Sequence, residues 1–61
     1  MENDEIDSIL NMLAGLVEVT EANGRKTAGT HMQAFHNGET SAYRGMFNFF
    51  QELREENART E

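Results

Sequence analysis

The sequence contains no cysteine, no proline and no tryptophan. Without cysteine the chain has no disulfide, and two histidines without thiolates do not make the usual ligand set of a structural zinc site. No apolar run approaches the roughly 20 residues that cross a membrane. A chain of 61 residues buries only about 60% of the surface that its unfolded form exposes. With disulfides and zinc set aside, we expect self-association to complete its hydrophobic core.

Basic residues are also scarce, and they are unevenly placed. The net charge is −6, and residues 1–22 hold acids but no base. We therefore expect no binding to DNA, RNA or an anionic membrane surface. The acidic N-terminal residues differ from the basic start of a secretory signal peptide, so we expect a cytoplasmic protein. One basic zone remains at residues 23–36, with Arg25, Lys26 and both histidines.

Apolar residues recur at steps of three and four, which is the period of a helix face. The first series predicts a helix over about 4–23, which Asn23-Gly24 is expected to end because glycine adopts the left-handed conformation of a helix C-terminus. Its apolar residues are Ile6, Ile9, Leu10, Leu13, Leu16 and Val17, with Met12 and Val19 beside them. A second series predicts a helix over about 29–58. The turn signal Asn37-Gly38 leaves open a break, with a third helix starting after it.

These segments predict an all-α fold with a single domain over 1–61, a two-helix antiparallel hairpin assembling into a homo-oligomeric helical bundle. If the chain folds back about residues 24–29, the numbers of facing residues add up to about 52, and the longer second helix extends past the first. The expected oligomer interface is on this overhang, at Phe47, Phe49, Phe50 and Leu53. In the alternative, the first helix bends or the C-terminus folds back to cover these side chains.

A ridge of small residues is also expected along the second helix, at Ala34, Gly38, Ala42 and Gly45. Small side chains let another backbone approach closely, so helix packing is the simpler interpretation of the ridge. A groove that admits a ligand is the other interpretation.

The basic zone predicts a site for a small anionic ligand. Amides at the start of the second helix, together with nearby bases and hydroxyls, suit a phosphate group. The candidate ligand-binding residues are Arg25, Lys26, Thr27, Thr30 and His31, with Tyr43 to stack on a base and Arg44 to contact a phosphate. In the alternative, the basic loop is solvated and offsets the negative end of the first helix, while Tyr43 packs in the core.

Neither catalysis nor metal binding is predicted. His31 and His36 are five residues apart, so they point away from each other on a helix, and His36 with Glu39 supplies only two ligands. Neither histidine has a nucleophile or carboxylate partner placed for general-base chemistry. We expect no enzymatic activity, no cofactor and no metal ion.

The segment from Ala34 to Leu53 resembles the second helix of small helical-hairpin proteins from phages and Gram-positive bacteria, with a Gly, then Ala-Tyr four residues on, then an apolar run ending in Leu. The resemblance implies an anti-defence protein in the host cytoplasm, of a class whose oligomers trap cyclic nucleotide signals between subunits. The leading hypothesis is an acidic homo-oligomer that sequesters a small anionic ligand, such as a cyclic nucleotide, at its subunit interfaces. The alternatives are an acidic inhibitor or adaptor that binds a host protein as a nucleic-acid mimic, and a structural oligomer without a ligand.

Overall fold

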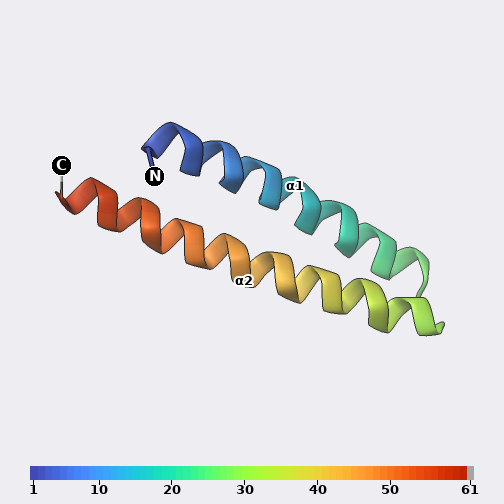
Figure 1. The fold of residues 1–61 in the computed structure, drawn as a ribbon. Coiled ribbons are helices and arrows are strands. Elements are labelled where there is room, and N and C mark those ends of the chain that lie inside the picture. The colour runs from blue at the N-terminus through green and yellow to red at the C-terminus, as the bar shows by residue number, and fades with distance from the viewer. Residues whose placement is uncertain (61) are drawn as a thin grey trace.

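The computed structural model describes residues 1–60, which form two helices, α1 (Asn3–Lys26) and α2 (His31–Thr60), joined by residues 27–30. The helices run antiparallel, side by side, in a rod that measures 48 × 14 × 12 Å (Figure 1). The predicted all-α hairpin is confirmed. The alternative with a third helix is wrong, because α2 continues through Asn37-Gly38. Within residues 1–60, neither helix combines the length and apolarity needed to cross a membrane.

The first helix continues through Asn23-Gly24, where the sequence predicts its end. Gly24 is buried against α2, and a Cβ atom at this position would lie 2.9 Å from Oδ1 of Asn37. Gly24 therefore lies within α1, where the absence of a side chain lets the two helices approach closely. The left-handed conformation occurs instead at Gly29, whose φ is 84°. The chain thus reverses direction later than the sequence predicts.

The later reversal changes the register between the helices. Side-chain contacts between the two arms of the hairpin include those of Thr20 with Thr40, Asp7 with Arg54, Glu21 with Arg44, and Met1 with Asn57. The numbers of these paired residues add up to 58–65, and to 60 for the buried threonine pair, whereas the sequence predicts about 52. The expected overhang is therefore wrong: the aromatic part of α2 lies beside the first half of α1, and only the last part of α2 extends past the start of α1 (Figure 1).

Side chains between the helices follow the alternating three- and four-residue steps of a coiled coil, because this spacing keeps one stripe of each helix facing its neighbour. We call these residues the inner seam. In α1 they are Asn3, Ile6, Leu10, Leu13, Val17, Thr20 and Gly24, and in α2 they are Gln33, His36, Thr40, Tyr43, Phe47, Phe50, Arg54 and Asn57. Each is buried or half-buried in the hairpin.

The core of the hairpin is small. Ile6 and Leu13, at 0% and 3% exposed, are its fully buried large apolar side chains within residues 1–60. Tyr43, Phe47 and Phe50 also lie in the inner seam but remain half-buried, because two helices cannot enclose a ring from all sides. Burial of two aliphatic side chains provides little hydrophobic stabilisation compared with the entropic cost of ordering about 60 residues.

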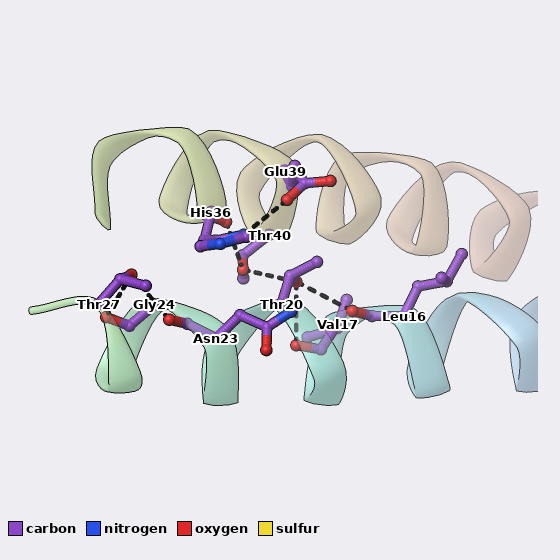
Figure 2. Close-up of polar contacts among 9 residues, drawn as sticks. All are labelled: Leu16, Val17, Thr20, Asn23, Gly24, Thr27, His36, Glu39 and Thr40. Atoms are coloured by element: carbon purple, nitrogen blue, oxygen red, sulfur yellow. Dashed lines mark hydrogen bonds and ion pairs between the residues drawn. The ribbon is translucent and has the colours of Figure 1, made fainter. Parts of the chain in front are cut away.

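Two threonines form a buried polar contact across the hairpin (Figure 2). The Thr40 hydroxyl donates a 2.7 Å hydrogen bond to the hydroxyl oxygen of Thr20. The Thr20 hydroxyl in turn donates to the carbonyl of Leu16 at 2.9 Å, so both buried oxygens have partners. A slip of one helix past the other would separate this pair and leave each hydroxyl with only a carbonyl of its own helix, that of Leu16 for Thr20 and that of His36 for Thr40. The slip would thus lose a hydrogen bond that contributes about 1 kcal/mol. The pair therefore favours this register.

We expect Thr20→Val and Thr40→Val each to lower the free energy of unfolding by about 1 kcal/mol, because each removes one member of the buried hydrogen bond. The double variant replaces both hydroxyls with methyl groups of the same shape, so it should cost clearly less than the two single changes together. Urea unfolding followed by circular dichroism at one protein concentration measures all four proteins. Strictly additive costs would show that the two hydroxyls are not coupled.

Candidate functional site

A second stripe, apolar over the middle of each helix, runs one residue before the inner seam, with Glu2 and Glu5 before its apolar part in the first arm and Glu56 after it in α2. We call it the outer seam. It comprises Ile9, Met12, Leu16 and Val19 in α1, and Met32, Phe35, Ala42, Met46, Phe49 and Leu53 in α2. One residue turns a helix by about 100°, and in an antiparallel pair a step backward turns both helices toward the same side. Both stripes therefore lie on one face of the hairpin.

This apolar face is open to solvent. Phe49 is 60% exposed, Met12 is 57% exposed, and Phe35 and Val19 are each 56% exposed. Within residues 1–60, seven large apolar side chains are exposed, six of them in the outer seam, whereas two are fully buried. Contiguous exposed apolar surface of this kind marks an interaction site in a protein.

One acidic residue interrupts the outer seam. Glu39 lies between Phe35 and Ala42 in the stripe, and its Oε1 is 2.9 Å from Nδ1 of His36 in the preceding turn (Figure 2). Both side chains are more than half-buried in the hairpin. The carboxylate thus already has a hydrogen-bonding partner, which reduces the cost of burying it further.

The opposite face of the hairpin is polar. Its residues follow the inner seam by one position, and they are Asp4, Asp7, Asn11, Ala14, Glu18, Glu21 and Arg25 in α1 and Asn37, Ser41, Arg44, Asn48, Gln51 and Glu55 in α2. Across this face, Nη2 of Arg44 lies 2.7 Å from Oε1 of Glu21. Both side chains are at least a third exposed, so the pair contributes little to stability.

An open groove of about 760 Å³ runs along the polar face near the turn. Arg25 and Arg44 line it, together with the amide side chains of Gln33, Asn37 and Asn48. These groups are hydrogen-bond donors, and the two guanidinium groups are its positive charges, while Glu21 contributes one carboxylate. The groove can therefore accept an anionic group.

The seven predicted ligand-binding residues do not form one cluster. Arg25 and Arg44 share the groove, but Lys26 and His31 are exposed outside its lining and Tyr43 lies in the inner seam. The two threonines of the turn do not line the groove either. The Thr27 hydroxyl donates to the carbonyl of Asn23 at 2.8 Å, and the Thr30 hydroxyl donates to the carbonyl of Thr27 at 2.7 Å. Their hydroxyl protons are thus used by the turn itself.

The predicted ridge of small residues is not a contact within the hairpin. A Cβ atom added at Gly38 or Gly45 would have no side-chain or tertiary neighbour within 4 Å, and Ala34 and Ala42 are exposed. Close approach of the two helices occurs instead at Gly24. The ridge therefore has no role in the packing of α1 against α2.

The four predicted interface residues divide between the two seams. Phe47 and Phe50 pack between the helices in the inner seam, whereas Phe49 and Leu53 belong to the outer seam. Sequence reasoning missed the contribution of α1, because it joined Ile9 and Leu16 with the core residues in a single stripe. The sequence did contain a signal for the second stripe: the apolar residues of the outer seam have three-and-four spacing of their own, offset by one residue from the inner seam.

Within residues 1–60, no three His, Asp or Glu side chains come close enough to hold a metal ion. Comparison of the chain with protein-family models, curated proteins and solved structures found no match.

We expect Arg44→Gln to leave the hairpin intact and to change the free energy of unfolding by less than about 1 kcal/mol, because it breaks an exposed ion pair. Chemical unfolding followed by circular dichroism measures the change. Arg59→Gln, which breaks the exposed pair with Glu56, is the matched control and should behave in the same way. A loss of helicity in the Arg44 variant alone would give this ion pair a structural role.

Proposed function

We propose that this chain is a non-catalytic interaction protein, whose outer seam binds an apolar helical surface of another polypeptide. The observation that carries the proposal is the exposed apolar face itself, to which both helices contribute along the same side. A partner of helical shape fits best, because the face repeats at the three- and four-residue steps by which helices interdigitate.

The energetics favour a bound state over the free hairpin. Burying one large apolar side chain contributes roughly 1.5–3 kcal/mol, and the outer seam offers Met12, Val19, Phe35, Met46 and Phe49 in exposed positions. The inner seam fully buries two such residues. A partner on the outer seam would therefore cover more large apolar side chains than the hairpin alone fully buries, against the entropic cost of association.

The acids of the chain are compatible with such a complex. Asp4, Asp7, Glu18 and Glu21 all belong to the polar face, on the side away from the outer seam. They would remain solvated when the apolar face is covered, so binding does not bury these charges. A nucleic-acid mimic would use this acidic side, but Asp7 and Glu21 are already paired with Arg54 and Arg44.

Site-specific photo-crosslinking tests the proposal in cells. A photoreactive phenylalanine analogue is placed at Phe49 in the outer seam or, as the matched control, at Asn48 on the polar face. Both positions are exposed on the same turn of α2. We expect irradiation to link position 49, and not position 48, to a polypeptide of any mass. Absence of a protein adduct at position 49, or equal adducts at both positions, would contradict the proposal.

A second candidate function is the sequestration of a small anionic ligand, such as a cyclic nucleotide. The groove on the polar face favours it, since about 760 Å³ is within the range of roughly 300–1,000 Å³ that is usual for small-molecule sites. Arg25 and Arg44 can contact phosphate groups there, and the neighbouring amides can bind a base edge or a sugar hydroxyl.

Isothermal titration calorimetry with cyclic di- and trinucleotides tests this candidate. We expect the double variant Arg25→Gln, Arg44→Gln to bind at least about 10-fold more weakly, because each lost charge-assisted hydrogen bond contributes about 1.5–3 kcal/mol. Arg59→Gln is the control, since it removes the same charge from the exposed C-terminal turn of α2. No heat with the wild type, or equal loss in the control, would exclude the groove as the site.

A further inference from the structure

We infer that the polypeptide bound by the outer seam is a second copy of this chain, and that two hairpins pack face to face as a two-fold symmetric four-helix bundle. The inference builds on the interaction function proposed above and identifies the partner.

The shape of the face favours a second copy. Because facing residue numbers add up to about 60, residues 9–19 of α1 lie level with residues 41–51 of α2. Over this length the apolar side chains of both helices form two parallel ridges, and the α2 ridge continues toward the turn at Phe35 and Met32. A two-fold interface needs a surface that is complementary to itself. Two ridges with three-and-four spacing meet this condition, since each hairpin offers the other the packing that its inner seam already uses.

The size of the face also fits a stable dimer. The outer seam runs from Met32 to Leu53 in α2, about 32 Å at 1.5 Å per residue, and two packed helices with their side chains are about 20 Å wide. Such a face would bury about 1,300 Å² over two copies, near the lower end of the roughly 1,200–2,000 Å² of a stable protein interface. The outer seam would then become the centre of a four-helix core. That core would enclose the half-buried rings of the inner seam as well, which a lone hairpin leaves partly in water.

Two glycines border the outer seam and have open space around them. Gly15 lies one turn from Met12 and Val19, and no side-chain or tertiary atom comes within 4 Å of a Cβ placed there. Gly38 lies one turn before Ala42 and is equally open, whereas Gly45 lines the groove on the polar face. A glycine inside a helix costs about 1 kcal/mol relative to alanine. A second hairpin gives these positions a purpose, because the absence of side chains admits its helices closely.

Charge is the main term against pairing two copies, since each carries −6. In the face-to-face arrangement the polar faces point away from each other, so their acids are separated from those of the other copy by the thickness of the bundle. These acids are Asp4, Asp7, Glu18, Glu21 and Glu55, whereas Glu2, Glu5 and Glu56 lie on the line of the outer seam beyond its apolar residues. Salt screens repulsion over the thickness of the bundle. Glu39, the acid within the seam, is already bonded to His36. We therefore expect added salt to strengthen the dimer, the opposite of its effect on an interface held by ion pairs.

Analytical ultracentrifugation of the purified chain tests the inference. We expect a mass of twice 6.9 kDa at micromolar concentration. Phe49→Glu should weaken dimerisation by at least about 100-fold, because each dimer would bury two added carboxylates. Asn48→Glu adds the same charge on the polar face of the same turn and should remain dimeric. Met12→Glu, on α1, should act as Phe49→Glu does.

The outcomes separate this inference from the function on which it rests. A helical wild-type monomer overturns the inference, and so does a dimer that survives Phe49→Glu. If the Phe49 variant also loses helicity, the wild-type Tm must rise with protein concentration, as folding linked to dimerisation requires; a constant Tm overturns the inference. A monomeric wild type that still crosslinks to another protein at position 49 leaves the interaction function standing.

Discussion

The hydrogen bond from Thr40 to Thr20 sets the register on which the rest of the structure depends. The pair is buried where the two helices meet, and sliding one helix along the other would separate the two hydroxyls and lose the hydrogen bond that joins the helices. The aliphatic contacts around Ile6 and Leu13 are less selective, because similar side chains recur every three or four residues and would repack after a slip. A polar contact in an otherwise apolar seam thus specifies one alignment among several that hydrophobic burial would allow.

This register gives the hairpin two unlike faces. Each helix carries an apolar stripe one residue before its inner seam and a polar stripe one residue after it. Because the helices are antiparallel, both apolar stripes come to the same side, and Arg44 meets Glu21 on the other side. A parallel pair would have placed the two apolar stripes on opposite sides. The separation of the faces is therefore a consequence of chain direction combined with a one-residue offset, and neither helix has it alone.

The sequence was sufficient for the helices and their antiparallel arrangement, because both depend on local periodicity and a short connection. The register predicted from the sequence was wrong, because the numbers of facing residues add up to about 60 in the structure and not to about 52. The cause is Gly24, whose small size was interpreted as a helix end although it serves close packing against Asn37. The error moved the aromatic residues past α1 and produced an overhang that the structure does not have. Which of two adjacent stripes becomes the core also could not be predicted, since Leu16 and Val17 are equally apolar.

The two faces also bear on the ligand hypothesis. The sequence suggested that an anionic ligand would be trapped between subunits, yet Arg25 and Arg44 line a groove on the polar face, and the apolar surface suited to a second copy lies on the opposite side. A dimer formed through the outer seam leaves one such groove exposed on each copy. Ligand binding and self-association would then be independent, unless dimers associate further through their polar faces. In that case acids such as Glu18 and Glu21 of the two dimers would repel each other, and an anionic ligand would not offset this repulsion by itself. The assembly would have to keep those carboxylates out of the contact or bind a cation together with the ligand.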